Sequence, residues 1–311
     1  MLRDAGLSEA ITWSFISPGS SARLELDEGP WQGAVVHNPL SEEQSLMRTT
    51  LLVGLIDAAQ RNLSRGAGRV ALFESGRVYL PERAPEEGGP LAGQFAGLRP
   101  PPLREPHRIG AIVCESLVAA SWRGEAAASD FYLGKGLVEL LCQVLRAPVE
   151  FNRASRPFLH PGRSAEVLIG GEPAGWLGEL HPRIAAAEDL PSAVAFELDA
   201  APLIAASGEG EEVYEDLMSY PAIYEDVAVV VDADVPAEAV RAAIHRGGGE
   251  LLRTARIFDV YEGEQIEAGK RSLALRLEFR APDRTLVDAE VAERREAIVA
   301  AVAEIGGALR G

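Results

Sequence analysis

The stretch KRSLALRLEFR at residues 270–280 decides how the last third of the chain folds. Side chains alternate across a β-strand, so Leu273, Leu275, Leu277 and Phe279 share one face. The other face carries Lys270, Ser272, Ala274, Arg276, Glu278 and Arg280, and is therefore expected to be mostly cationic. One apolar face and one polar face predict a strand that packs against helices on one side and meets solvent on the other.

The segments on either side of this strand predict a ferredoxin-like module over residues 219–311. The apolar run DVAVVVD predicts its first strand, and PAEAVRAAIHR predicts a helix with Val240, Ala243 and Ile244 on one face. The predicted elements are, in chain order, a strand over 226–232, a helix over 236–246, strands over 251–261 and 270–280, a second helix, and a short strand over 308–311. This is the order β-α-β-β-α-β.

Two local signals indicate where the helices of this module start. Pro236 suits the first turn of a helix, where the N–H that proline lacks has no intrahelical partner. Thr285 and Asp288 form a capping-box pattern before a helix that carries Val291 and Ile298 on its apolar side. We therefore expect the second helix to open at this box.

The solvent face of the 270–280 strand is typical of a surface that binds nucleic acid. Lys270, Arg276 and Arg280 lie on this face, and Arg256 and Tyr261 belong to the strand before it. Cations can contact phosphates while an aromatic ring stacks on an unpaired base. The alternative is that the face is polar only because half-exposed strands are polar on their outer side.

Composition limits what such a surface can do. The chain has 311 residues, of which 47% are hydrophobic and 25% charged, and this is long enough for two domains. Its net charge of -17 argues against a general nucleic-acid binder, because phosphate contacts supply most non-specific affinity. Residues 241–284 nevertheless carry more Lys and Arg than Asp and Glu, while residues 207–226 carry acids and no Lys or Arg. Any RNA contact is therefore expected to be local.

The ends and the cysteines suggest a piece of an intracellular protein. The opening MLRDAGLSEA has no secretory pattern and predicts a chain that begins inside a helix, as expected of a fragment. No run reaches the roughly 20 apolar residues that a membrane helix needs. Cys114 and Cys142 lack metal-ligand spacing and are predicted to be buried thiols.

Residues 1–204 predict a first domain, followed by an acidic linker over 205–218 and by the module over 219–311. Helices are predicted over 51–65 and 130–145 from their apolar spacing, and a proline-rich surface loop over 82–106. The predicted strands cover 10–16, 70–79, 109–114, 149–152, 165–169, 174–180 and 193–198. Because few helices separate these strands, we predict an α+β fold with a mostly antiparallel sheet.

No catalytic motif is evident in the sequence. His160 and His181 each precede a proline, and they lack the spacing or the neighbouring ligands of a zinc pair. We interpret both as turn residues that hydrogen-bond to the backbone. Arg77 suits either a phosphate contact or an ion pair with Glu74. The residues by themselves therefore indicate a binding or scaffolding protein, with no catalytic and no metal-binding residue predicted.

Many short strings, in the right order over nearly the whole chain, resemble the family of bacterial phenylalanyl-tRNA synthetase beta subunits. In the first domain these are VHNPLS (36–41), MRTTLL (47–52), LFESGRVY (72–79), DFY (130–132) with KG (135–136), HPGRSA (160–165) and GWLGELHP (175–182). In the module they are YP (220–221), Asp226, FDVY (258–261), Lys270, Ser272, Leu273 and RTL (284–286). Each string alone is weak evidence, whereas the ordered set is specific.

The resemblance implies that residues 1–204 have a class II synthetase-like fold that has lost the ATP and amino-acid sites. Such a domain serves as an interface for the catalytic alpha subunit. The helix over 51–65 would then pack in a bundle between subunits, with Arg48, Leu52, Leu55 and Ala59 at the contact. No cofactor is expected in this chain, and ATP and Mg²⁺ are expected in the complete α2β2 enzyme.

For residues 219–311 the resemblance implies a ferredoxin-fold domain that binds the anticodon of tRNA(Phe). Tyr261 would stack on a base, and Lys270, Arg276, Arg280 and Arg256 would approach phosphates or base edges. Members commonly carry a basic residue before the aspartate that matches Asp226, and here that position is Glu225. We expect this departure to remove one phosphate contact. The implied location is the cytoplasm, with no membrane or DNA partner, and the isolated chain could form a homodimer.

Two alternative functions remain open from the sequence. One is a stand-alone enzyme that uses His160, His181 and Glu179. The other is a protein-interaction module that makes no RNA contact. The first requires turnover that depends on the histidines, and the second requires that the basic sheet face contributes nothing to tRNA binding.

Overall fold

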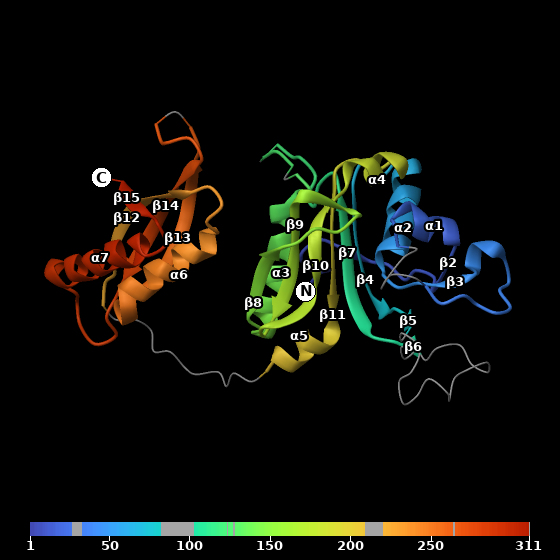
Figure 1. The fold of residues 1–311 in the computed structure, drawn as a ribbon, viewed down its shortest axis with the longest axis horizontal. Helices are drawn as coiled ribbons and strands as arrows, with labels where there is room; N and C mark the ends of the chain where they lie inside the picture. Colours follow the sequence, from blue (N-terminus) through green and yellow to red (C-terminus); the bar gives the residue numbers. More distant parts are fainter. Residues whose placement is uncertain are drawn as a thin grey trace, which may run out of the picture. The chain divides into compact units, whose positions relative to one another are not determined.

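A computed structural model describes residues 1–26, 33–81, 103–122, 124–126, 128–208, 220–263 and 265–310. The chain divides into two compact units, Met1–Val213 and Tyr214–Gly311, which are described separately below (Figure 1). The helix α5 (Ala200–Ala206) continues into the first residues of the predicted linker. The remainder of that linker, from residue 209, lies outside the described residues.

The first unit is built on a seven-stranded sheet with the strand order β1-β4-β7-β11-β10-β9-β8. These strands are β1 (Ser8–Glu9), β4 (Val70–Arg77), β7 (His107–Cys114), β11 (Ala193–Asp199), β10 (Glu172–Leu180), β9 (Leu159–Ile169) and β8 (Val149–Arg153). The pair β1–β4 is parallel and all the other pairs are antiparallel. The predicted α+β fold with a mostly antiparallel sheet is confirmed.

Two long helices cover opposite faces of this sheet (Figure 1). Helix α2 (Leu52–Ser64) packs on β4 and β7, and helix α3 (Phe131–Leu145) packs on β10 and β11 together with α5. Asp130 caps α3 by accepting a hydrogen bond from the N–H of Leu133 at 2.9 Å. Both helices follow the predicted ranges, because their apolar residues recur at helical spacing over three turns or more.

Short elements of the first unit escaped prediction because they carry too few residues for a periodic signal. They are α1 (Pro18–Arg23), α4 (Pro182–Ala187), β3 (Leu46–Met47), the antiparallel pair of β5 (Leu80–Pro81) and β6 (Leu103–Arg104), and a 3₁₀ turn over Glu42–Gln44. Strand β3 pairs antiparallel with β2 (Phe15–Ile16). Most of the predicted proline-rich loop, residues 82–102, lies outside the described residues.

Two predictions near the start of the chain are wrong. The first residues form hydrogen-bonded turns, with the N–H of Ala5 donating to Met1 and the N–H of Leu7 donating to Leu2, so no helix begins there. The predicted strand over 10–16 shrinks to the two residues of β2. In this segment Ile11 and Trp13 are exposed, and an alternating pattern alone therefore did not indicate a buried sheet.

The second unit is a four-stranded antiparallel sheet with the order β13-β14-β12-β15 and two helices on one face (Figure 1). Its elements are β12 (Ile223–Asp232), α6 (Ala237–Gly248), a 3₁₀ turn over Gly249–Leu251, β13 (Leu252–Tyr261), β14 (Lys270–Phe279), α7 (Asp288–Ala303) and β15 (Ala308–Arg310). The ferredoxin-like order β-α-β-β-α-β is confirmed. Leu273, Leu275, Leu277 and Phe279 are buried in its core, as the alternation predicted.

The capping box predicted for the second helix is wrong in its residues. Helix α7 begins at Asp288, and the side chain of Glu290 accepts a hydrogen bond from the N–H of Val287 at 3.1 Å. Arg284 pairs with the same carboxylate at 2.5 Å. The helix start is therefore fixed from inside its first turn, and Thr285 lies before it.

Among the described helices, none combines the length and the apolar character needed to cross a membrane.

Candidate nucleic-acid interface

The outer face of the second unit's sheet, turned away from α6 and α7, has a floor of small side chains. Ala274 of β14 lies opposite Ala228 of β12, and Ser272 lies opposite Val230. These positions alternate with the buried leucines of β14, so they share the face that the sequence predicted to meet solvent. Small side chains on neighbouring strands leave a shallow surface on which a flat ring can lie.

Two aromatic rings on β13 border this floor. Tyr261, which lies opposite Ser272, is 37% exposed, and Phe258 is 54% exposed. A register shift between Ile257 and Asp259 interrupts the alternation of the strand. Phe258 consequently contacts Arg276, whose guanidinium carbon lies 5.6 Å from the ring centroid. The sequence analysis missed Phe258, because the string FDVY contains no signal for the bulge.

The predicted cations of this face are largely tied to neighbouring acids. Arg276 forms two hydrogen bonds of 2.8 Å with the two carboxylate oxygens of Asp226. Lys270 pairs with Glu267, and Arg280 pairs with Glu278. The expectation of a mostly cationic face is therefore wrong, because each of these three positive charges has a carboxylate beside it.

Arg256 differs from these three cations. It lies opposite Arg276 on β13 and forms no ion pair with any of the described residues. Hydrogen bonds from Arg276 hold the pKa of Asp226 below its usual value, and Glu267 raises the pKa of Lys270. The paired groups thus stay charged around neutral pH, and Arg256 has no carboxylate partner among the described residues that competes with an incoming phosphate.

Glu225 does not lie on the outer face. It is paired in register with Leu277, a core residue, whereas its neighbour Asp226 is paired with Arg276. One carboxylate oxygen of Glu225 is buried without a hydrogen-bond partner among the described residues. The unusual residue at this position therefore faces the helices, and its effect on a phosphate at the outer face is indirect at most.

The four residues predicted to contact another subunit lie inside the first unit. Leu52, Leu55 and Ala59 of α2 are almost fully buried in the chain's own core, and Arg48 is 3% exposed. Arg48 donates to Glu74 at 2.7 Å and to Thr12 at 2.9 Å. Side chains buried in this way have no surface left for a second chain, so these four assignments are wrong. A subunit contact elsewhere on the first unit stays a prediction.

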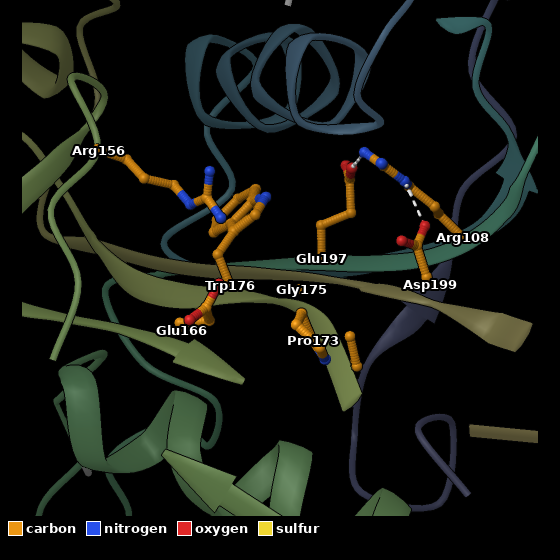
Figure 2. Close-up of a pocket in the computed structure, with 9 residues that line it drawn as sticks. Arg108, Arg156, Glu166, Pro173, Gly175, Trp176, Glu197 and Asp199 are labelled. Carbon is orange, nitrogen blue, oxygen red and sulfur yellow. Dashed lines mark hydrogen bonds and ion pairs between the residues drawn. The ribbon is translucent and has the colours of Figure 1, made fainter. Parts of the chain in front are cut away.

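A cavity of about 170 Å³ lies on the α2 side of the sheet of the first unit (Figure 2). Glu197 and Asp199 both point at Arg108, at 2.5 and 2.7 Å. Glu197 also accepts hydrogen bonds from the hydroxyl of Thr50 at 2.6 Å and the N–H of Leu51 at 2.7 Å. This carboxylate therefore fixes the start of α2 on the sheet, and its oxygens are occupied by structural bonds.

The histidines and the cysteines have structural surroundings. The Nδ1 atoms of His160 and His181 accept hydrogen bonds from the N–H groups of Gly162 at 3.1 Å and Arg183 at 3.2 Å, which confirms the predicted bonds to the backbone. Their placement in turns is wrong, because His160 belongs to β9 and His181 caps the start of α4. In the part of the chain that the structure describes, no group of three or more His, Cys, Asp and Glu side chains suits a metal. Burial raises the pKa of Cys114 to about 12 and that of Cys142 to about 11.

Two protein-family models match the chain. Residues 1–200 match a model described as phenylalanyl tRNA synthetase beta chain CLM domain, and residues 219–310 match a ferredoxin-fold anticodon binding domain. The chain belongs to the phenylalanyl-tRNA synthetase beta-chain family. The outer face with Tyr261 and Phe258 thus belongs to a domain whose family description names anticodon binding.

Curated relatives agree with this assignment. The chain is 44% identical over 316 residues to the phenylalanine–tRNA ligase beta subunit of Moorella thermoacetica, covering 98% of this chain and 37% of the relative. It is 38% identical to the same subunit of Geobacillus kaustophilus (100% and 37% covered) and 34% identical to that of Staphylococcus aureus (100% and 36% covered). The chain therefore spans little more than a third of these relatives.

A solved structure of a pyrrolysyl-tRNA synthetase from Desulfitobacterium hafniense is more distant. It has a TM-score of 0.45 and 10% identity, and the match covers 65% of this chain and 61% of that one.

Proposed function

We propose that the chain is the C-terminal part of the beta subunit of phenylalanine–tRNA ligase and that its second unit binds the anticodon of tRNA(Phe). The observation that carries this proposal is the outer sheet face. Phe258 and Tyr261 border a floor that includes Ala274, and Arg256 lies beside them without an ion pair among the described residues. An unpaired base can lie on such a floor, stack on a ring and leave its phosphate near the arginine.

The pair of Asp226 and Arg276 supports a more specific role for this face. The forked edge of the guanidinium is occupied by the carboxylate, and Phe258 lies against it at 5.6 Å. Arg276 consequently offers a base its planar surface instead of hydrogen-bond donors directed at a phosphate. The guanidinium plane of Arg276 thus adds a third flat group beside the rings of Phe258 and Tyr261.

The first unit supplies, in this proposal, a contact with the catalytic alpha subunit. Trp13 and Phe15 are exposed and line a surface hollow of about 440 Å³ together with Gln60 and Arg61 of α2. An exposed tryptophan beside a second aromatic ring is typical of the centre of a protein interface. The contact therefore involves the solvent side of α2, in place of the buried side that the sequence indicated.

The remaining parts of the proposal concern the complete enzyme. Ligation of phenylalanine to tRNA, with ATP and Mg²⁺ held by the alpha subunit of an α2β2 assembly in the cytoplasm, is proposed for the whole protein. The paired carboxylates of the first unit support a domain without catalysis of its own, because Glu197 and Glu74 are both engaged in buried structural bonds. Without the alpha subunit, the Trp13 hollow is a candidate surface for a homodimer.

The test compares tRNA(Phe) with the same tRNA carrying a different anticodon, titrated against the chain co-expressed with the alpha subunit. We expect tighter binding of tRNA(Phe) and loss of this preference in Phe258→Ala and Tyr261→Ala. Val299→Ala on α7 is the matched control, since this side chain is 44% exposed and belongs to a helix on the opposite face of the sheet. Equal affinity for both tRNAs would contradict the proposal and favour a protein-interaction module.

A further inference from the structure

A second hollow, on the surface of the first unit, is formed where four separate segments of the chain meet. It is lined by Tyr132 and Lys135 from the first turns of α3, Phe151 and Arg153 from β8, Arg163 from β9 and Glu179 from β10, and its volume is about 440 Å³. The strings DFY and HPGRSA therefore lie together at one place. The function proposed above assigns no role to them.

The hollow has an exposed aromatic ring that is held in place. Tyr132 is 77% exposed, and the ring of Phe131 contacts it edge-on with centroids 5.8 Å apart. Its backbone belongs to a capped helix, because Asp130 accepts from the N–H of Leu133 and Glu179 accepts from the N–H of Phe131 at 3.1 Å. A fixed, solvent-facing ring is ready to stack with little loss of conformational entropy.

The same hollow is locally basic in an acidic protein. Residues 151–165 (FNRASRPFLHPGRSA) contain three arginines and a histidine and no Asp or Glu, whereas the chain carries a net charge of -17. Arg153 is exposed and forms no ion pair with any described residue. Arg163 is paired with Glu179 at 2.8 Å, and Lys135 is paired with Glu139 at 2.6 Å and lies 4.9 Å from the centroid of Phe151.

We propose that this hollow binds one nucleotide of a single-stranded RNA segment, with the base on Tyr132 and the phosphate at Arg153. A flat ring next to an unpaired cation is the combination that single-stranded nucleic acids require, and the volume falls within the range of small-molecule pockets. The choice of RNA rests on the proposed function, to which this site adds a second contact on the same chain. Two contacts on one RNA raise its overall affinity above that of either alone.

The test uses the full chain and a fluorescein-labelled oligouridine of about ten nucleotides, followed by anisotropy at several salt concentrations. It is carried out in a Phe258→Ala/Tyr261→Ala background, which removes the rings of the outer sheet face. Tyr132→Ala is expected to weaken binding about tenfold, and Tyr132→Phe to restore most of it. Arg153→Gln is expected to weaken binding and to reduce the salt slope by about one ion.

Matched controls come from the same unit. Trp122→Ala removes an exposed ring that does not line the hollow, and Arg183→Gln removes an exposed arginine that is paired with Glu25. Neither is expected to change oligouridine affinity. If Tyr132→Ala and Arg153→Gln behave like these controls, the proposal is overturned. Binding of an acidic peptide that depends on Arg153, without RNA binding, also overturns it.

The outcomes separate this site from the outer sheet face. If Phe258→Ala/Tyr261→Ala alone abolishes oligouridine binding, the hollow fails and the proposed function stands. Loss of binding in Tyr132→Ala, with no change in Phe258→Ala/Tyr261→Ala, supports the hollow and argues against the proposed anticodon face. Photocrosslinking with 5-bromouridine RNA gives an independent readout, because the hollow predicts a crosslink in the peptide that contains Tyr132.

Discussion

The two sheets of this protein use similar ion pairs for opposite purposes. In the first unit Arg48 and Glu74 lie 2.7 Å apart with side chains that are 4% and 3% exposed. In the second unit Arg276 and Asp226 lie 2.8 Å apart with side chains that are 59% and 48% exposed. The two distances are nearly the same, so burial distinguishes the roles of the two pairs. The buried pair holds β4 to its neighbours, whereas the exposed pair forms part of the proposed binding surface.

The largest effect is expected from breaking the buried pair. Arg48→Ala leaves Glu74 charged and buried without its guanidinium partner, which costs about 3–5 kcal/mol of unfolding free energy. The measurement is urea denaturation followed by tryptophan fluorescence, since all four tryptophans belong to the first unit. Arg276→Ala is the matched control, followed by circular dichroism because the second unit holds no tryptophan, and its exposed pair is expected to contribute less than about 1 kcal/mol. Equal losses in both variants would show that burial does not separate the pairs.

A somewhat smaller effect is expected from the apolar side of α2. Leu55→Ala creates a cavity in the core of the first unit and is expected to cost about 2–5 kcal/mol of stability. If Leu55 instead contacts the alpha subunit, the isolated chain keeps its stability and only the complex weakens. Ile11→Ala is the control, because this side chain is 93% exposed and its loss should leave the unfolding midpoint unchanged.

The outer sheet face is expected to respond in binding and not in stability. Phe258→Ala removes a ring that can stack on a base and on Arg276, so tRNA affinity is expected to fall by about 1–3 kcal/mol. The free energy of unfolding of the second unit, measured by thermal denaturation, should stay within about 0.5 kcal/mol of the parent value, because the ring is half exposed. A large loss of stability with unchanged affinity would make Phe258 a structural residue.

The smallest effect concerns the protonation of Asp226. Hydrogen bonds from Arg276 lower its pKa in the folded state, so the pair adds stability above the usual carboxyl pKa and loses it as pH falls through the lowered value. Carboxyl NMR titration is expected to give a midpoint below 3.8 in the parent and a higher one in Arg276→Gln. Asp4 is the control. This exposed carboxylate is hydrogen-bonded to the N-terminal amine and not to Arg276, so Arg276→Gln should leave its titration midpoint unchanged.

The comparison also shows how far local sequence patterns reach. Alternation in residues 270–280 correctly placed Leu273 and Leu275 in the core, and helical spacing placed α2 and α3. Helical spacing also predicted that Leu52 and Leu55 form an apolar stripe. It did not indicate whether the chain itself or a second chain covers that stripe. Burial is a property of the assembled sheet and helix, and a periodic pattern alone does not specify the partner.

The charges illustrate the same limit. Sequence order placed Lys270, Arg276 and Arg280 on one face, as the register of β14 requires. The partner of Arg276 could not be assigned, because Asp226 is 50 residues away in the chain and meets it only across two strands. Glu267 and Glu278, by contrast, are close neighbours in sequence of Lys270 and Arg280. Net charge counted along a segment therefore overestimated how cationic the face is.

The sequence by itself determined the longer strands, the long helices and much of the core of each unit, because side-chain period is a local consequence of backbone geometry. It also carried the ordered strings that indicate the family. Only the tertiary structure decided that a bulge turns Phe258 toward Arg276, that Glu197 fixes the start of α2, and that two distant strings join around Tyr132. Each of these depends on contacts between segments far apart in the chain, which no local pattern contains.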